Sequence, residues 1–237
     1  MSEKLINTVL DAGTTWSKIL ERNGLDKMKP YENYMVKEDN GFKYYILPSF
    51  ELKKTNIIFD KATGHMSLNL IKDKKDYENE VIALTNGFRK HVSEDSMVLD
   101  MGSRDSKWVL FKNGKFKDLD WNNSCSSSTG ATIEMLLKFY NLKSENLKFN
   151  KEKYVITCGI FGLERIMDDI AKGEKSEEAI SKFIHGIAYN AWVFAKKPSK
   201  LYLSGGFCEN ECFVESLGQY CEIIPLGRFL LCEGLLG

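Results

Sequence analysis

Two stretches of the chain carry the same acidic, glycine, serine and lysine residues at the same spacing. One runs from Leu10 to Lys18 and the other from Leu99 to Lys107, and both read Leu-Asp-x-Gly-x-x-x-Ser-Lys. Each follows an apolar, strand-like run and precedes a second one, which predicts a strand–turn–strand hairpin in both places. Five identities in the same context indicate that the chain consists of two related halves.

A turn of this composition suits phosphate. A glycine after a strand lets backbone N–H groups approach an anion closely, and neighbouring hydroxyls add donors. An aspartate at the strand end can hold hydrated Mg²⁺, which prefers one or two carboxylates together with phosphate oxygens. Two such turns would bind a triphosphate from two sides, whereas either turn alone could be an ordinary Asp-Gly hairpin.

A third glycine-rich element lies near the end of the chain. Gly205 and Gly206 follow the strand-like run Lys200–Leu203 and precede a predicted helix, and paired glycines there allow close approach of a nucleoside. A simple packing turn is the alternative. The sequence has no GxxxxGK[ST] and no GxGxxG, which excludes the P-loop and Rossmann classes of nucleotide-binding protein.

Apolar runs and helical periodicity alternate along the chain and predict an α/β protein with mixed sheets. The predicted strands are Leu5–Leu10, Ile57–Phe59, Met97–Met101, Lys107–Phe111, Phe116–Trp121, Tyr154–Thr157 and Lys200–Leu203. The predicted helices are Asp76–His91, Thr129–Asn141, Gly162–Lys172, Glu177–Lys196 and Glu211–Cys221. The fourth helix has the clearest apolar stripe and is expected in a core.

Seven segments in this order resemble the BadF/BadG/BcrA/BcrD-type ATPases, the activators of 2-hydroxyacyl-CoA dehydratases and benzoyl-CoA reductases, within the acetate and sugar kinase, Hsp70 and actin superfamily. Besides the two turns and Ser204–Asn210, they are Ala62–His65, Asn79–Val81, Asn122–Gly130 and Cys158–Gly162. The chain differs from the family pattern at Ser103 and Arg104, where the family has Gly and Gln. It also differs at Ser126–Ser128 and at Leu163, where the family has Ala-Ala-Gly and Glu.

The resemblance implies an actin-like, ribonuclease H-like fold of duplicated mixed-sheet lobes with a nucleotide cleft between them. Residues 1–96, completed by 226–237, would form the first lobe, and residues 97–225 the second. ATP or ADP with Mg²⁺ would be the ligand. Catalytic roles are expected for Asp11, Asp100, Arg104 and Asp105. Nucleotide contacts are expected from Gly13, Thr14, Thr15, Lys18, Gly102, Ser103, Lys107, Gly205, Gly206 and Asn210.

The resemblance also implies that Cys125 and Cys158 ligate a [4Fe–4S] cluster shared across a homodimer. A cubane takes about four thiolates, so two per chain require a second chain across a two-fold axis. Cys208, Cys212, Cys221 and Cys232 are expected as buried thiols, although a metal site is the open alternative. His185 lies in the fourth predicted helix and is expected as a satisfied boundary histidine.

The composition indicates which partners and which cellular compartment to expect. Thirty-three lysines and arginines balance 33 aspartates and glutamates, which argues against nucleic acid as a partner. No apolar run approaches the ~20 residues that span a bilayer, and the charged N-terminus does not resemble a signal peptide. Six unevenly spaced cysteines favour a reducing cytoplasm over a secreted disulfide framework.

The function that the resemblance implies is ATP-dependent activation of a partner metalloenzyme, such as a 2-hydroxyacyl-CoA dehydratase or a related double-cubane reductase. Electrons would come from a ferredoxin-like donor. Two alternatives remain open: a small-molecule kinase of the same superfamily in which the cysteines are structural, and an assembly subunit with weakened ATP turnover.

Overall fold

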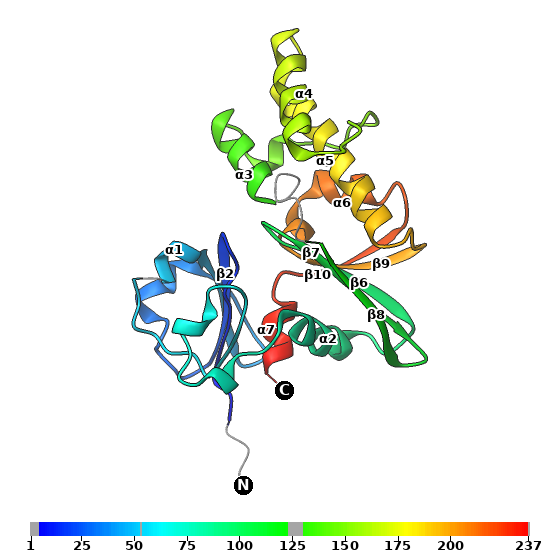
Figure 1. The fold of residues 1–237 in the computed structure, drawn as a ribbon. Helices are drawn as coiled ribbons and strands as arrows, with labels where there is room; N and C mark the ends of the chain where they lie inside the picture. Colours follow the sequence, from blue (N-terminus) through cyan, green and yellow to red (C-terminus); the bar gives the residue numbers. More distant parts are fainter. Residues whose placement is uncertain (1–4, 53, 123–129, 237) are drawn as a thin grey trace. The chain divides into compact units, whose positions relative to one another are not determined.

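The computed structural model describes residues 5–52, 54–122 and 130–236. It divides into two compact units (Figure 1). The first unit comprises Met1–Ser93 and Arg228–Gly237, and the second comprises Glu94–Gly227. The C-terminal segment therefore belongs to the unit that contains the N-terminus.

The described part of the first unit holds a five-stranded sheet in the order β3-β4-β2-β1-β5. Its strands are β1 (Thr8–Asp11), β2 (Trp16–Arg22), β3 (Met35–Asp39), β4 (Phe42–Pro48) and β5 (Lys61–Thr63). Neighbours among β1, β2, β4 and β3 are antiparallel, whereas β5 lies parallel to β1. Short elements join them, namely η1 (Lys29–Tyr34), α1 (Ser49–Leu52), η2 (Ser67–Asn69) and η3 (Lys74–Asp76).

Two helices, α2 (Glu80–His91) and α7 (Leu230–Leu235), complete the first unit. They cross closely because Gly87 faces the backbone of Leu230, and Gly234 faces the carbonyl oxygen of Ala83. Lys90 Nζ donates to the carbonyl of Glu233 at 2.8 Å. The C-terminal helix is thus fixed to α2 through backbone contact that leaves no room for a side chain.

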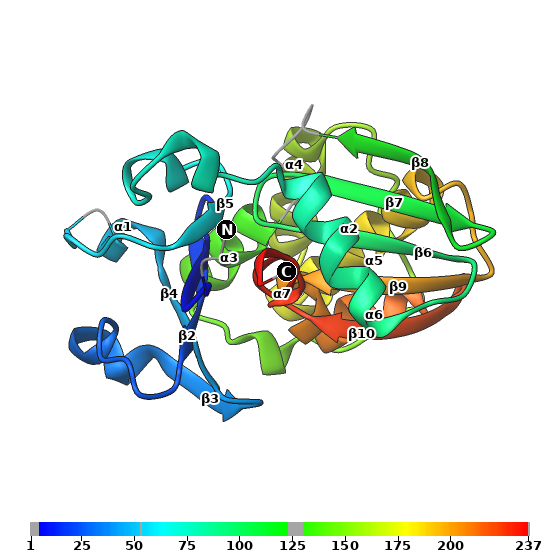
Figure 2. The same cartoon turned by 90° about the horizontal axis from the view of Figure 1, so that it is seen from below.

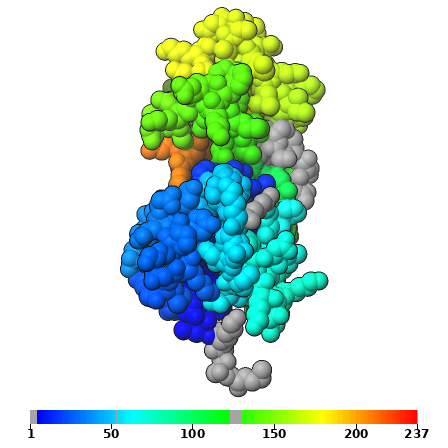
Figure 3. Space-filling model, turned by 90° about the vertical axis from the view of Figure 1, so that its left-hand side faces the viewer, coloured from blue at the N-terminus to red at the C-terminus, as the bar shows by residue number. Residues whose placement is uncertain are grey.

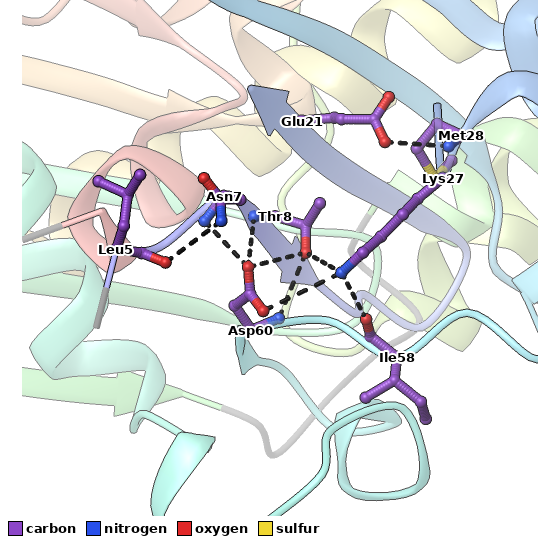
Figure 4. Close-up of polar contacts among 8 residues, drawn as sticks. All are labelled: Leu5, Asn7, Thr8, Glu21, Lys27, Met28, Ile58 and Asp60. Atoms are coloured by element: carbon purple, nitrogen blue, oxygen red, sulfur yellow. Dashed lines mark hydrogen bonds and ion pairs between the residues drawn. The ribbon is translucent and has the colours of Figure 1, made fainter. Parts of the chain in front are cut away.

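The start of β1 is held by one carboxylate (Figure 4). Asp60 Oδ2 accepts from the backbone N–H of Asn7 at 2.9 Å and of Thr8 at 3.1 Å. Lys27 Nζ donates to Thr8 Oγ1 and to the carbonyl of Ile58, at 3.3 and 3.2 Å. These contacts lie at the opposite end of β1 from Asp11 and fix the strand that leads to the first turn.

A buried carboxylate lies beside this network in Figure 4. Glu21 is fully buried and accepts from the backbone N–H of Met28 at 3.1 Å and from Tyr45 Oη at 3.3 Å. Burial raises the pKa of Glu21, since removal from water disfavours the charged form. Its hydrogen bonds provide the compensation that a buried polar group needs.

The described part of the second unit holds a five-stranded sheet in the order β10-β9-β6-β7-β8, which Figure 2 shows. Its strands are β6 (Ser96–Met101), β7 (Ser106–Lys112), β8 (Lys115–Asn122), β9 (Lys200–Gly205) and β10 (Glu222–Gly227). The helices are α3 (Gly130–Phe139), α4 (Gly159–Ala171), α5 (Ser176–Phe194) and α6 (Glu211–Leu217), with η5 (Ser144–Asn146) and η6 (Gly206–Glu209).

Helix α5 carries much of the core of the second unit. Ile180, Phe183, Ile184 and Ile187 are buried against strand residues that include Leu99 and Leu203. The apolar stripe predicted from the sequence is therefore confirmed as a core-facing surface.

The two units repeat the same strand arrangement. In the first unit β1 pairs antiparallel with β2 and parallel with β5, and in the second unit β6 pairs antiparallel with β7 and parallel with β9. Asp11 lies opposite Lys18 in one hairpin, and Asp100 lies opposite Lys107 in the other. The internal duplication predicted from the sequence is present in the strand register.

Two strand predictions were wrong. Tyr154–Thr157 is not a strand, because its alternating side chains pack on α5: the backbone N–H of Tyr154 donates to the carbonyl of Lys182, and Asn190 Nδ2 donates to that of Ile156. Ile57–Phe59 contributes only an isolated bridge at Phe59, and the paired strand is β5.

Several elements were missed or misjudged in length. The strands β3, β4 and β10 were not predicted. Helix α2 begins at Glu80 after the N-cap Asn79, α4 begins at Gly159, and α6 ends at Leu217. No helix in the described ranges is long and apolar enough to cross a membrane.

The α2–α7 crossing predicts a stability effect. Gly234→Ala would place a methyl group on the Ala83 carbonyl, and overpacking of this kind costs about 1–3 kcal/mol in free energy of unfolding. Gly218→Ala is the matched control, because Gly218 has αR dihedrals and a Cβ there would come no closer than 3.2 Å to a backbone atom, so a much smaller change is expected. Denaturant unfolding of both variants measures the difference, and equal stabilities would contradict the prediction.

Candidate functional site

In the first turn an ion pair joins the last residue of β1 to the facing residue of β2. Lys18 Nζ lies 2.8 Å from Asp11 Oδ2, and both side chains are largely buried. Thr14 is exposed, and Gly13 and Thr15 are half-buried. A Cβ at Gly13 would meet the carbonyl oxygen of Trp16, so only glycine fits this turn. Its hydroxyls and backbone remain accessible to a ligand.

Ser49 positions the first turn, and sequence reasoning missed it. Its Oγ donates to the carbonyl of Gly13 at 2.6 Å, and its backbone N–H donates to that of Thr15 at 2.9 Å. Gly64 supports the turn from the other side: it has φ +90°, and a Cβ there would fall 2.6 Å from the Ala12 carbonyl oxygen. The contact with Ser49 depends on the pairing of β2 with β4, and no local signal marks it.

The second turn has a denser set of charges. Lys107 Nζ lies 3.5 Å from Asp100 Oδ2 and 3.8 Å from Asp105 Oδ1, and Lys107 is buried. The backbone N–H of Gly102 donates to the carbonyl of Asp105 at 3.0 Å, which closes the turn. Arg104 is exposed at its tip. The four charged residues predicted here therefore do lie together.

Trp121 on β8 is a second residue that sequence reasoning missed. Its Nε1–H donates to Asp105 Oδ2 at 2.6 Å, and Lys107 Nζ lies 5.1 Å from the centroid of its ring. The register places Trp121 directly opposite Lys107. The alternation along β8 could have put this side chain beside the turn, but not its bond to Asp105.

The Gly205–Gly206 turn lies beside the second turn, because β9 pairs with β6 and Gly205 is opposite Met101. Gly205 has φ +89°, and a Cβ there would meet the backbone of Met101. Asn210 caps α6, since its Oδ1 accepts from the N–H of Phe213 at 2.8 Å. The predicted nucleotide contacts are thus divided between the two units. Those within 11–18 lie in the first unit, and those within 100–107 and 205–210 lie in the second.

The start of α3 is bonded to the second turn. The N–H of Ala131 donates to the carbonyl of Ser103 at 3.0 Å, and that of Gly130 donates to Gly102 at 3.4 Å. Cys125, the first expected cluster ligand, lies outside the described residues. The described residues on both sides of it, Trp121 and Gly130, contact the second turn.

Cys158, the second expected cluster ligand, is the N-cap residue of α4 and is half-buried. Six apolar side chains of the second unit are each more than half exposed: Met135 and Phe139 on α3, Val155 before α4, and Ile160, Phe161 and Met167 on α4. Figure 3 shows α3 in green and α4 in yellow-green at the surface of the second unit.

The remaining described cysteines are unpaired thiols that hydrogen-bond to separate carbonyls or lie in the core. Cys208 Sγ donates to Leu203 at 3.0 Å, Cys212 to Lys148 at 3.4 Å and Cys232 to Lys18 at 3.2 Å. Burial raises the pKa of Cys208 to about 12 and that of Cys221 to about 11. Within the described ranges, no three His, Cys, Asp or Glu side chains group so as to hold a metal ion.

Both ring nitrogens of His185 have hydrogen-bond partners. Its Nδ1 faces the carbonyl oxygens of Asn150 and Glu152, at 2.8 and 3.2 Å, so this nitrogen carries the proton. Its Nε2 then accepts from Tyr220 Oη at 2.8 Å, and Lys153 Nζ donates to the same Tyr220 oxygen at 3.0 Å. This geometry is that of a structural histidine.

The sequence resembles two curated activators, although no family model matches the chain. It is 24% identical over 210 residues to the (R)-2-hydroxyglutaryl-CoA dehydratase activating ATPase of Acidaminococcus fermentans, covering 81% of this chain and 78% of that protein. It is 20% identical over 168 residues to the 2-hydroxyisocaproyl-CoA dehydratase activator of Clostridioides difficile, covering 67% and 63%.

Solved structures of the same two kinds of protein share the fold. The Clostridium difficile activator of 2-hydroxyisocaproyl-CoA dehydratase, with bound ADPNP, superposes with TM-score 0.73 at 19% identity, covering 98% of this chain and 92% of that one. Component A of the A. fermentans dehydratase gives 0.71 at 17%, covering 98% and 95%. These comparisons confirm the predicted two-lobed, actin-like α/β fold and the resemblance to dehydratase activators.

The ion pair in the first turn leads to a stability prediction. Lys18→Met would leave Asp11 buried without its partner, which is expected to lower the free energy of unfolding by about 3 kcal/mol. Lys61→Met is the matched control, because Lys61 pairs with Glu78 at 3.3 Å but both side chains are about one quarter exposed. That pair is worth at most ~1 kcal/mol. Equal losses of unfolding free energy in the two variants, measured by urea unfolding, would contradict a larger contribution from the Asp11–Lys18 pair.

Proposed function

We propose that this chain is an ATP-hydrolysing activator that delivers electrons to a partner metalloenzyme such as a 2-hydroxyacyl-CoA dehydratase or a related double-cubane reductase. The observation that carries the proposal is the duplicated Asp–Lys hairpin, present in a chain whose fold is that of dehydratase activators. A relative of this fold binds ADPNP, and another is named an activating ATPase.

Each turn would contribute donors and charge to a bound nucleotide. Gly13, Thr14 and Thr15 offer backbone and hydroxyl donors from the first unit. In the second unit Ser103 would offer its hydroxyl, and Gly102, which has no side chain, would let phosphate approach the turn closely. Lys18 and Lys107 would balance phosphate charge, and Gly205 and Gly206 would pack on the nucleoside. Asp11 and Asp100 each keep a carboxylate at a strand end, which suits a cation that retains most of its water.

Arg104 and Asp105 would act at the transferred phosphate. Arg104 is exposed at the tip of the second turn, and a guanidinium there can stabilise the charge that develops on phosphate oxygens. Asp105 is fixed in direction by Lys107 and Trp121. Both residues are thus available to orient water and phosphate.

A shared [4Fe–4S] cluster would be held by cysteines of the second unit. Cys158 is an unpaired thiol at the N-terminus of a 13-residue helix, and the positive end of the helix dipole there would suit an anionic cluster. The exposed apolar side chains on α3 and α4 would be covered by a second copy of the chain. Cys125 and Cys158 from each of two chains would hold the cluster, which when bound supplies one-electron chemistry, with a ferredoxin-like protein as the donor. Such a thiolate site requires a reducing compartment, as in a cytoplasm.

Iron content tests the cluster. Anaerobically purified protein is expected to be a brown dimer with about two irons per chain. Cys125→Ala and Cys158→Ala are expected to lose colour and iron together, while Cys221→Ala, the matched control at a buried thiol, keeps both. A colourless wild-type protein would contradict electron delivery and leave the kinase or the assembly subunit.

ATP turnover tests the role of the two aspartates. Asp11→Asn and Asp100→Asn are each expected to lower phosphate release from MgATP about 100-fold, because either change removes a carboxylate that orients the metal. Asp118→Asn is the matched control, since Asp118 also pairs with a lysine, Lys196, at 2.8 Å but lies outside the turns.

The outcomes of the turnover assay separate the alternatives. Phosphate transfer to an added small molecule, with no release in its absence, would indicate a kinase. Wild-type protein without any turnover would indicate an assembly subunit.

A further inference from the structure

The contact between Trp121 and Asp105 distinguishes the second turn from the first. The bond from Nε1 to Oδ2 is short, 2.6 Å, as expected for a hydrogen bond to a carboxylate. The indole lies on β8 and is 37% exposed, so a good part of its surface is in contact with the protein.

The first unit is an internal comparison. There β2 lies between β1 and β4, and the residue of β4 opposite Lys18 is Ile46. In the second unit the residue opposite Lys107 is Trp121. Trp16 holds the repeat position of Asp105. The first turn therefore lacks the extra carboxylate, and the β4 residue opposite its lysine is an isoleucine, whereas the second turn has the carboxylate Asp105 and an indole opposite its lysine.

The direction of Asp105 affects the other charges of the second turn. Lys107 Nζ is 3.5 Å from Asp100 and 3.8 Å from Asp105, so the two carboxylates share one buried lysine. At such distances, and away from water, a change in carboxylate position alters the interaction strongly. Trp121 engages Oδ2, while Oδ1 faces the lysine. The indole therefore holds Asp105 with one oxygen on its N–H and the other toward Lys107.

We propose that Trp121 is a positioning residue for nucleotide at the second turn: its N–H fixes Asp105, and through Asp105 it sets the Lys107–Asp100 pair. This inference rests on the proposed function, because it requires that the turn binds MgATP. Trp121 itself touches no reacting atom in this scheme.

Binding of ADPNP with Mg²⁺ to Trp121→Phe tests the proposal. Phe keeps an aromatic ring but lacks the N–H, so Asp105 and the Lys107–Asp100 pair would no longer be held in the geometry that binds nucleotide, and affinity is expected to fall about tenfold. Trp192→Phe is the matched control. Its indole N–H donates to Pro198 at 3.1 Å and Lys197 lies 5.6 Å from its ring, so the same groups are changed away from the turn, and affinity should stay at the wild-type value.

A double-mutant cycle separates positioning from general destabilisation. In an Asp105→Ala background, Trp121→Phe is expected to change ADPNP affinity less than about twofold, because the carboxylate that it positions is gone. Equal effects with and without Asp105 would overturn the proposal. So would a Trp121→Phe variant with wild-type affinity.

A spectroscopic signal keeps the test decisive if Trp121→Phe fails to fold. In ¹⁵N-labelled protein the indole N–H resonance of Trp121 can be assigned by elimination with Trp16→Phe, Trp108→Phe and Trp192→Phe. Its chemical shift is expected to change in Asp105→Ala and on addition of ADPNP. An unchanged chemical shift in both cases would overturn the proposal. Wild-type protein that does not bind ADPNP at all would overturn the proposed function as well, whereas binding that is insensitive to Trp121 overturns this inference alone.

Discussion

Each unit depends on an ion pair between an aspartate and a lysine that face each other across a hairpin. Asp11 with Lys18 and Asp100 with Lys107 are cross-strand neighbours, and in both hairpins the side chains are nearly buried. A buried carboxylate and a buried lysine each need the other, so the pair fixes the strand register. The register in turn sets where the glycine turn begins. In the first unit Lys18 lies 2.8 Å from Asp11, whereas in the second unit Lys107 lies 3.5 Å from Asp100 and 3.8 Å from Asp105.

That constraint also explains which features the sequence could predict. The Asp-x-Gly-x-x-x-Ser-Lys repeat is local, and so is the apolar stripe of α5, and both predicted structure correctly. The strand predicted at Tyr154–Thr157 was wrong because its apolar alternation is satisfied by packing on α5, which is remote in sequence. Ser49 and Trp121 act on the turns through strand pairing. Neither residue has a neighbouring signal, so only the folded chain brings them to the site.

The proposed electron delivery gives an energetic reason for a fold that hydrolyses a nucleotide. Lowering a one-electron potential by ~200 mV costs about 4.6 kcal/mol, whereas coupling between two sites through binding is typically ~1–3 kcal/mol. Binding alone would account for part of such a shift, and hydrolysis would supply the rest. The contacts of Ala131 with Ser103 and of Trp121 with Asp105 connect the second turn to the described residues on both sides of Cys125, so a change at the turn has a short route to that segment.

The most direct test of this account is the midpoint potential of the proposed [4Fe–4S] cluster in reconstituted protein. It is measured by redox titration in two states, one with MgADP bound and one with Mg²⁺ and ADPNP bound. A coupling of ~1–3 kcal/mol between nucleotide and cluster predicts a difference of about 40–130 mV between the two states. That result would establish that the turns and the cluster communicate. Identical potentials in the two states, with nucleotide bound in both, would contradict the claim that this chain couples ATP to electron delivery.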